Sequence, residues 1–474
     1  MSQPPAELLR RLETGTASSA ELERLLGQSQ SAVSRHLRQL IAAGTVMRIG
    51  STHGARYVML RPIEAIGARW PLRRIDPTGQ IQLLGTLNSI AASGFCFEPE
   101  SRAFAWGGIS QGLPYFLQDQ RPAGFLGGAV PRRYPELNLP QRVSDWNDDH
   151  YLRYLTQCGS DTVGDLVLGD KAFDRFLATP SQRAVVRVDD RVSRYPQLVE
   201  EVTAGGLPGS FAHGEQPKFA TLLEDADGPR HVLVKFSPPD RTVVGKRWSD
   251  LLVAEHIAHR AMADAGLPAA RSHIERYADR MYLEVERFDR VGLDGRRGVT
   301  SLLAIDAVQY GKLDNWIDSA ARLHMDGRID AASLELVRMV ATFGAFIANT
   351  DRHFGNIAFH DAYDGRYSLA PMYDMLPMLF APEHDQVTPR DFHPPDPTAD
   401  TLPAYVRARA LAEDYWRRCM QDPRISEEFR TICANCGAAL AALPRTGKYN
   451  YEAARPVRTT VRRARAARTP TQAQ

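Results

Sequence analysis

The first sixty residues show three stretches with helical hydrophobic periodicity, followed by two short stretches typical of strands. The second helix is expected to begin at Ser18, because Glu21 three residues later completes a capping box. Four apolar residues of the third helix fall on one face at helical spacing: Val33, Leu37, Leu40 and Ile41. The loop 50–55 separates the two strands. Helix, helix, helix and hairpin, in this order, predict a winged helix-turn-helix domain over residues 1–62.

The opposite face of the third predicted helix carries short polar side chains and arginines. These residues are Gln30, Ser31, Ser34, Arg35 and Arg38. In a winged helix-turn-helix this helix enters the major groove, where such side chains contact base edges and phosphates. Residues 1–62 contain eight arginines and four glutamates, a local charge of +4, and the wing adds Arg48 and Arg56 to this surface. We therefore expect the domain to bind double-stranded DNA; a protein-interaction module with a solvated polar face is the alternative.

The rest of the chain divides less clearly. Residues 63–190 mix apolar stretches with turns and contain no motif that indicates chemistry, so we assign them to a mixed subdomain that opens the main body. At the other end, residues 451–474 carry six arginines in a stretch rich in proline, threonine and alanine. This composition predicts a basic disordered tail, which either adds non-specific affinity for phosphate backbones or only improves solubility.

Composition narrows the class of protein. The 474 residues are 43% hydrophobic and 24% charged, which is typical of a globular chain with several domains. No stretch reaches the roughly 18 apolar residues of a membrane span, and the polar start lacks a signal-peptide core, so we expect a cytoplasmic protein. Five cysteines argue against a disulfide framework, and the single C-x-x-C, Cys433 and Cys436, lacks the second pair of a metal site. The net charge of +2 leaves nucleic-acid binding to local patches.

Lysine is rare in this chain, and two of its lysines fall in one segment. Only six of the 58 basic residues are lysine, among them Lys218 and Lys235. A glycine-bearing segment at 205–223 turns into one strand, and Lys235 lies near the end of the next. Backbone N–H groups of such a loop approach phosphates closely, and a lysine on the adjacent strand supplies positive charge. Glu255, on the helix that follows, is a candidate to orient Lys235; a solvated surface position is the alternative.

The strongest signal is the sequence NTDRHFGN at 349–356, which follows a predicted buried helix. Asp351 and Asn356 stand five residues apart, as do the aspartate and asparagine of the kinase catalytic loop. In that loop the aspartate accepts the proton of a substrate hydroxyl and the asparagine holds Mg²⁺. Two strands around the turn at Asp364 predict a hairpin, which carries the segment before Asp374 back beside Asn356. Simple capping roles for the two aspartates are the alternative.

Five motifs occur along the chain in the order GEQPKF, HVLVKF, LEVERFDR, IANTDRHFGNIAF and LAPMYD. Together they resemble the HipA family of bacterial serine/threonine toxin kinases, above all its YjjJ-type branch, over roughly residues 100–450. The resemblance implies an α+β, two-lobed protein-kinase-like fold, with the N-lobe at 191–290 and a mostly helical C-lobe at 291–450. It also implies ATP and Mg²⁺ as cofactors. The family's partner antitoxin usually supplies DNA binding, whereas here a winged helix is fused to the chain, so whether a separate antitoxin exists stays open.

The resemblance assigns roles to seven residues. These are Lys235 for the ATP phosphates, Glu286 and Phe288 for the adenine-binding backbone, Asp351 as the catalytic carboxylate, Asn356 and Asp374 for Mg²⁺, and His353 in the same loop. The family's glycine-bearing loop often carries a serine whose autophosphorylation silences the kinase. Phe211 occupies that position here and Ser210 stands one residue too early. Either Ser210 substitutes after a small loop shift, or this switch is missing.

The sequence thus predicts an ATP-dependent serine/threonine protein kinase, the toxin of a type II toxin–antitoxin system, with a DNA-binding domain for autoregulation. The family resemblance implies a protein substrate similar to the aminoacyl-tRNA synthetases that relatives phosphorylate, although no residue of this chain identifies the substrate. One alternative is a transcriptional regulator whose kinase-like body senses nucleotide. Another is a kinase acting on a lipid or small molecule, because DRHFGN also resembles the catalytic loop of phosphoinositide kinases.

Overall fold

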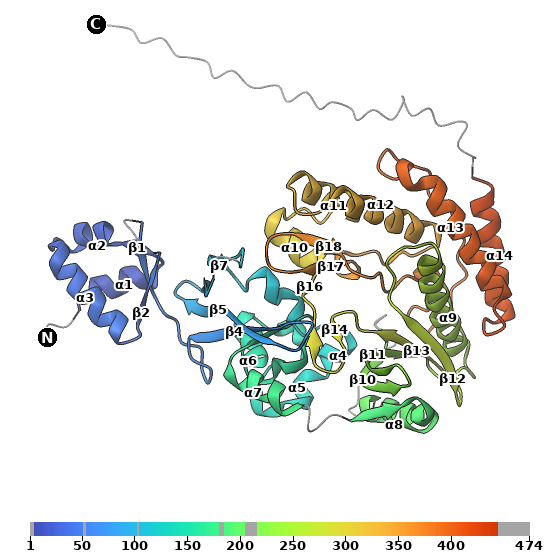
Figure 1. Ribbon diagram of the computed structural model, residues 1–474, viewed down its shortest axis with the longest axis horizontal. Helices are drawn as coiled ribbons and strands as arrows, with labels where there is room; N and C mark the ends of the chain where they lie inside the picture. Colours follow the sequence, from blue (N-terminus) through green and yellow to red (C-terminus); the bar gives the residue numbers. More distant parts are fainter. Residues whose placement is uncertain (1–3, 51–53, 102–103, 180–183, 204–215, 444–474) are drawn as a thin grey trace, which may run out of the picture.

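The computed structural model describes residues 4–50, 54–101, 104–179, 184–203 and 216–443. Along the chain it comprises a small N-terminal domain, a middle domain, and two lobes with the long helix α9 between them (Figure 1). Ser210, Phe211 and the basic tail at 451–474 lie outside the described residues.

The N-terminal domain has the predicted order of helices and strands. It contains α1 (Ala6–Glu13), α2 (Ser19–Leu26), α3 (Gln30–Ala42) and a sheet of order β1-β3-β2, made of β1 (Ala17–Ser18), β2 (Val46–Ile49) and β3 (Arg56–Met59). Ser18 and Glu21 form the predicted capping box. The prediction for Ile41 is wrong: it is 39% exposed, and His36, 6% exposed, lies on the buried face instead. A helix turns about 100° per residue, which leaves Ile41 about 80° from Val33, at the margin of the apolar stripe.

The wing of this domain packs against the middle domain. Leu60, just after β3, shares a buried apolar cluster with Ile90 and Cys96 of the middle domain and forms an isolated β-bridge with Ile90. Beside this cluster, Arg61 donates two hydrogen bonds, of 2.6 and 2.8 Å, to the carboxylate of Asp149. Apolar burial and a two-pronged ion pair therefore dock the two domains together.

The middle domain is built on a five-stranded antiparallel sheet of order β7-β6-β5-β4-β8. Its strands are β4 (Arg69–Ile75), β5 (Ile81–Ile90), β6 (Gly94–Pro99), β7 (Gly108–Gln111) and β8 (Leu166–Leu168), and its helices are α4 (Gly124–Gly128), α5 (Val130–Arg133), α6 (Asp148–Cys158) and α7 (Asp170–Ala178). The core of this domain is a separate buried cluster, in which Leu72, Phe97, Tyr115 and Leu152 are buried and to which Tyr363 of the C-lobe contributes.

The N-lobe is a second five-stranded sheet, of order β12-β13-β11-β10-β9, covered by a helix on each face. Its elements are β9 (Val185–Arg187), α8 (Arg191–Thr203), β10 (Lys218–Asp225), β11 (Gly228–Phe236), α9 (Val243–Asp264), β12 (Ser272–Tyr277) and β13 (Arg280–Glu286). Tyr195 of α8 packs with Val232 and Val234 on one face, whereas α9 packs with Leu283 and Val285 on the other. Strand β9, parallel to β10, lies before residue 191, where the sequence placed the start of this lobe.

The C-lobe is mostly helical. It contains α10 (Leu302–Gln309), α11 (Trp316–Met325), α12 (Ala331–Phe346), α13 (Leu402–Gln421) and α14 (Glu427–Ala441), with a small sheet of β16 (Val299–Ser301), β17 (Ala358–Asp361) and β18 (Tyr367–Leu369), and the short hairpin β14 (Arg290–Val291) and β15 (Gly295–Arg296) precedes it. Strands β17 and β18 pair as an antiparallel hairpin, as predicted. All five cysteines are free and buried, and Cys433 and Cys436 pack in the core of this lobe. None of the helices in the described ranges is both long and apolar enough to cross a membrane.

Candidate active site

A buried lysine near the end of β11 joins the two lobes by ion pairs. The ammonium of Lys235 donates to both carboxylate oxygens of Glu255 on α9, at 2.6 and 2.7 Å. It also donates to Asp374, which follows β18 in the C-lobe. Lys235 is 5% exposed and Glu255 is fully buried. The proposed ion pair with Glu255 is therefore present, and its solvated alternative is wrong.

Charge and burial act in opposite directions on these groups. Burial alone would lower the pKa of Lys235, but the charges of Asp374 and Glu255 raise that pKa above its ordinary value. Burial raises the pKa of Glu255 against the opposing charge of Lys235. Burial would also raise the pKa of Asp374, but Lys235 and Lys218 outweigh it and lower this pKa to about 2. Asp374 is thus a carboxylate at neutral pH, the form that binds cations.

The loop after α12 brings Asp351 and Asn356 together. The amide nitrogen of Asn356 donates to the backbone oxygen of Asp351 at 2.8 Å and lies 3.4 Å from its carboxylate. Asp351 is exposed, whereas Asn356 is 6% exposed. A third residue, Asn349, links this loop to Asp374. Its side-chain oxygen accepts from the N–H of Asp351 at 3.0 Å, and its nitrogen donates to the backbone oxygen of Asp374 at 3.3 Å.

The β17–β18 hairpin returns the chain to this loop. The hydroxyl of Tyr373 donates to the backbone oxygen of Gly355 at 2.7 Å, so the residue before Asp374 contacts the residue before Asn356. Asp374 itself has a φ of 53°, a left-handed conformation that few residues other than glycine adopt. Strained backbone of this kind clusters at functional sites, where surrounding contacts hold it in place.

Two further predicted residues lie beside this arrangement. The ring of Phe288, just after β13, lies 5.7 Å from the ring of Tyr373, which places it next to Asp374. His353 is an exposed residue of the catalytic loop, and its ring accepts a hydrogen bond of 2.9 Å from the N–H of Gly355. The structure therefore brings Phe288 and His353 to the edge of the site.

The side chain of Glu286 points elsewhere. Glu286 pairs with Val232, which packs on the α8 face of the sheet, whereas Lys235 meets Glu255 on the α9 face. Its carboxylate lies 3.9 Å from Arg230 and 3.8 Å from Arg271. Any contribution of Glu286 to adenine binding is thus left to its backbone, as the resemblance implied.

Sequence reasoning assigned no role to several residues that shape the site, although it singled out Lys218 as one of the few lysines of the chain. Asn349 stands inside the NTDRHFGN motif, two residues before Asp351, and its amide was the available signal. Lys218 of β10 pairs with Lys235 of β11, and the signal for it in the sequence was the rarity of lysine in this chain. His259 on α9 is 1% exposed and lies 3.9 Å from Glu255. Burial lowers the pKa of His259 to about 3, so this ring is neutral and adds no charge beside Lys235.

Three parts of the chain match models of known families. Residues 6–47 match the bacterial regulatory protein arsR family, residues 66–177 the YjjJ-like toxin middle domain, and residues 210–440 the HipA-like C-terminal domain. The toxin YjjJ of Escherichia coli (strain K12) is 34% identical over 439 residues, which cover 90% of this chain and 95% of that protein. The chain belongs to the family of YjjJ-like toxins.

A solved structure shows the fold of this YjjJ-like chain. A chain in the complex of Shewanella oneidensis MR-1 HipA, HipB and operator DNA matches with a TM-score of 0.53 and 16% identity, over 79% of this chain and 96% of that one. The predicted α+β, two-lobed HipA-like fold with an N-terminal helix-turn-helix is thereby confirmed. The Helicobacter pylori proinflammatory kinase CtkA has a TM-score of 0.32 over 47% of this chain, too low to bear on the fold.

In the YjjJ-like chain, the arsR-type match spans the three helices of the N-terminal domain. The predicted DNA-contacting residues of α3 lie at its surface: Gln30, Ser31, Arg35 and Arg38 are exposed and Ser34 is partly exposed. Arg56 of the wing instead donates to Thr16 at 2.7 Å and to Glu21 at 3.2 Å. Part of its charge is therefore neutralised within the domain, and the predicted contribution of this arginine to a DNA-facing wing is reduced.

Proposed function

We propose that this YjjJ-like toxin is an ATP- and Mg²⁺-dependent kinase that phosphorylates serine or threonine hydroxyls of a protein. The observation that carries the proposal is the buried Lys235, held between Glu255 of the N-lobe helix and Asp374 of the C-lobe. A strand lysine paired with a helix glutamate, opposite an aspartate next to a catalytic loop, is the set of parts that protein kinases use. Simple capping roles for Asp351 and Asp374 do not explain an ion pair that crosses between the lobes.

The residues present fit a nucleotide with its metal. ATP with bound Mg²⁺ supplies the phosphoryl group and neutralises its charge. The amide nitrogen of Asn356 is engaged by Asp351, which leaves the amide oxygen as the ligand, and Asp374 is ionised. Among the described residues no three His, Cys, Asp or Glu side chains form a cluster able to hold an ion. Two protein ligands suit Mg²⁺, because phosphate oxygens and water complete its coordination.

The remaining roles follow from position. Lys235 holds phosphate oxygens, and Glu255 keeps the ammonium aimed at them. Asp351 is an exposed residue of the catalytic loop, so its carboxylate is accessible to a substrate hydroxyl. The carboxylate accepts the proton of that hydroxyl. Asn349 fixes the backbone of both Asp351 and Asp374, and acts as a positioning residue. Catalysis then rests mainly on positioning and on charge neutralisation.

A matched pair of aspartate variants tests the proposal. Asp351→Ala should bind ATP with Mg²⁺ like the wild type by calorimetry, yet lose phosphoryl transfer in a comparison of phosphoproteomes from expressing cells. Asp364→Ala, the same change at an exposed turn of the hairpin, should keep both properties. Full transfer by Asp351→Ala, or no uptake of ATP by the wild type, would refute the kinase proposal. Phosphate found on lipids or small molecules, and not on proteins, would favour the other kinase class.

The arsR-type domain favours a second activity, binding to double-stranded DNA through the exposed face of α3. The two activities are compatible, since a kinase with its own DNA-binding domain is able to repress its own operon. A transcriptional regulator that only senses nucleotide would bind ATP, and Asp351→Ala would then change nothing. Co-purification from the native host tests for a separate antitoxin, because the matching Shewanella oneidensis chain belongs to a complex of a toxin–antitoxin system, HipA, HipB and operator DNA.

A further inference from the structure

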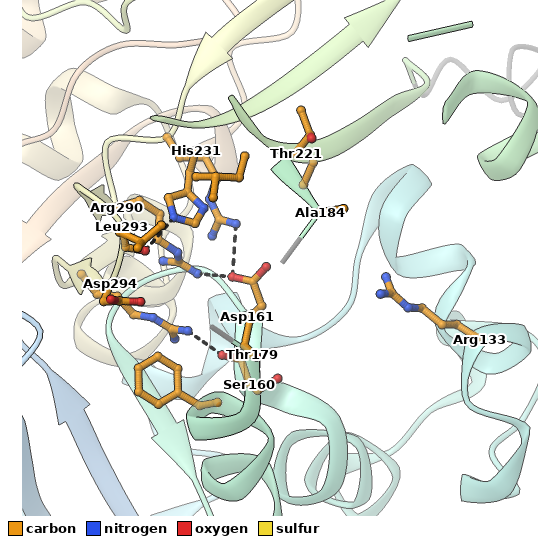
Figure 2. Close-up of a pocket in the computed structure, with 15 residues that line it drawn as sticks. Arg133, Ser160, Asp161, Thr179, Ala184, Thr221, His231, Arg290, Leu293 and Asp294 are labelled. Carbon is orange, nitrogen blue, oxygen red and sulfur yellow. Dashed lines mark hydrogen bonds and ion pairs between the residues drawn. The ribbon is translucent and has the colours of Figure 1, made fainter. Parts of the chain in front are cut away.

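The middle domain meets the two lobes at more than one place. At one junction, Asp161 of the middle domain accepts a hydrogen bond of 2.7 Å from Arg290 of the β14–β15 hairpin. Figure 2 shows these two side chains facing each other. The backbone oxygen of Ser160 accepts a second hydrogen bond, of 2.6 Å, from Arg296 of the same hairpin. These contacts hold the middle domain to the hairpin that follows the N-lobe, and the catalytic loop takes no part in them.

A second junction is formed by a short 3₁₀ helix of the middle domain, η1 (Tyr115–Gln120). The ring of Phe116 in η1 lies 5.4 Å from the ring of Phe97 on β6. The side chain of Gln120 donates to the backbone oxygen of Leu166 on β8 at 3.0 Å. Because η1 is packed and hydrogen-bonded against its own sheet, it can be displaced only if the middle domain moves with it.

Asp119 of η1 holds the end of β16 in the C-lobe. Its carboxylate accepts two hydrogen bonds of 2.6 Å from Ser301, one from the backbone N–H and one from the hydroxyl. Ser301 pairs with Ala358, the first residue of β17. The next N–H along the chain donates to the backbone oxygen of Ile357 at 2.9 Å, and Ile357 directly follows Asn356. Asp119 thus fixes, through Ser301, the backbone next to the proposed Mg²⁺ ligand.

The middle domain also holds the opposite end of β17. Asp361, the last residue of this strand, is 2% exposed, and its carboxylate accepts a hydrogen bond of 3.0 Å from the hydroxyl of Tyr115 in η1. Tyr363, in the turn beyond the strand, packs in the core cluster of the middle domain, and its hydroxyl donates to Asp165 at 2.7 Å. Strand β17 is therefore held at both ends by contacts with the middle domain.

We propose that the middle domain positions the Mg²⁺-binding end of the β17–β18 hairpin, with Asp119 and Tyr115 as positioning residues. This inference rests on the proposed kinase function, because it concerns the groups that hold Asn356. Mg²⁺ requires nearly ideal octahedral geometry, so a small displacement of one ligand weakens its binding. Loss of a group that orients a metal ligand typically lowers metal affinity by about 10- to 100-fold.

A purely structural role of these contacts leads to a different expectation. They would then only join the domains, and their loss would lower the stability of the chain without changing the cleft of the folded protein. The affinity for nucleotide that depends on Mg²⁺ separates the two interpretations, because it depends on Asn356 and Asp374. The affinity for nucleotide without the metal depends instead on Lys235, which the middle domain does not hold through η1.

Calorimetry of the full chain with a non-hydrolysable ATP analogue, in excess Mg²⁺ and again in EDTA, tests the proposal. The ratio of the two dissociation constants gives the gain in affinity due to Mg²⁺. This gain should fall about 10-fold in Asp119→Asn, because the amide cannot accept both hydrogen bonds from Ser301. It should fall about 3-fold in Tyr115→Phe, which loses one hydroxyl and acts further from the ligand. The affinity in EDTA should match that of the wild type in both variants.

Two conservative changes in the same domain are the matched controls. Tyr151→Phe removes a hydroxyl that donates to the backbone oxygen of Val143 at 3.3 Å, within the middle domain. Asp170→Asn changes an exposed aspartate that pairs with Arg73 of the same domain. Both controls should keep the gain of the wild type. If they lose as much of it as the η1 variants, the effect is not specific to η1 and the inference is wrong.

The remaining outcomes separate this inference from the kinase proposal. A wild type that binds the analogue more tightly with Mg²⁺, together with an unchanged gain in Tyr115→Phe and Asp119→Asn, would overturn the positioning role and leave the kinase proposal standing. A wild type that takes up no analogue would overturn both. If Asp119→Asn fails to fold by circular dichroism, Tyr115→Phe decides alone, since it keeps the ring in place and removes only the hydrogen bond to Asp361.

Discussion

Removal of Glu255 with Lys235 left in place tests the charge arrangement of the cleft most directly. In Glu255→Ala the buried ammonium loses the two hydrogen bonds of 2.6 and 2.7 Å and keeps only Asp374. Breaking a buried pair by removing one partner costs about 3–5 kcal/mol. Because Asp374 still compensates part of the charge, we expect the lower end, about 3 kcal/mol. For a body of this size that loss lowers Tm by roughly 6–12 °C.

The comparison that isolates the charge is the double variant Lys235→Met with Glu255→Leu. It removes both charges and fills the space with apolar side chains, so we expect its stability to lie within about 1 kcal/mol of the wild type or above it. Asp374, whose side chain is 28% exposed, is then hydrated from the open side of the cleft. Glu255→Leu alone and Lys235→Met alone complete the cycle, and unfolding in urea and by heat measures all five proteins. Phosphoryl transfer should be lost in every variant that lacks Lys235.

Two results would refute this reasoning. A cost below about 1 kcal/mol for Glu255→Ala would mean that the ion pair is hydrated in solution, against its burial in the structure. A double variant as unstable as Glu255→Ala would mean that packing around the side chains, and not the unpaired charge, determines the loss. A Glu255→Ala protein that keeps full phosphoryl transfer would remove the orienting role of the glutamate.

Three other predictions concern separate parts of the chain. Burial raises the pKa of Asp361 to about 6, above the value of roughly 3.9 in an unfolded chain. The protonated carboxyl stabilises the folded protein at low pH, and this stabilisation is lost as pH rises from 4 to 7. In urea unfolding, the free energy of unfolding of the wild type should therefore fall by about 3 kcal/mol relative to that of Asp361→Asn over this range. Asn349→Ala should lower kcat at least about 10-fold with little change in KM for ATP, because the backbone N–H of Asp351 loses its hydrogen bond to Asn349. Steady-state kinetics measures both constants, and an unchanged kcat would exclude a positioning role for Asn349. Arg35→Ala and Arg38→Ala should each weaken DNA binding and reduce the salt slope by about 1 in fluorescence anisotropy, while Arg24→Ala on α2 should change neither; equal effects at all three would exclude α3 as the contact surface.

The parts of the site that local spacing controls could be predicted from the sequence. The five-residue separation of Asp351 and Asn356 and the hairpin turn at Asp364 depend only on neighbouring residues, so the pattern was sufficient to place Asn356 beside the segment that carries Asp374. Glu255 was a correct guess of a different kind. It rested on an analogy, because no periodicity distinguishes a buried glutamate of α9 from a solvated one.

The parts that depend on distant contacts could not be predicted. Asp161 meets Arg290 across 129 positions of sequence, and no local pattern joins them. Arg296 of β15 donates to the backbone oxygen of Ser160 only because the middle domain folds against the β14–β15 hairpin. His36 in place of Ile41 on the buried face of α3 reflects tertiary packing that periodicity does not contain.

The docked wing has a consequence for any complex with DNA. Leu60 and Arg61 are packed and hydrogen-bonded against the middle domain, so α3 cannot rotate relative to that domain without breaking these contacts. When α3 sits in a major groove, the direction in which the cleft of the two lobes opens is set by the duplex itself. A second protein bound to neighbouring DNA would approach the cleft from one fixed direction. The length of DNA between the two proteins would decide whether they touch.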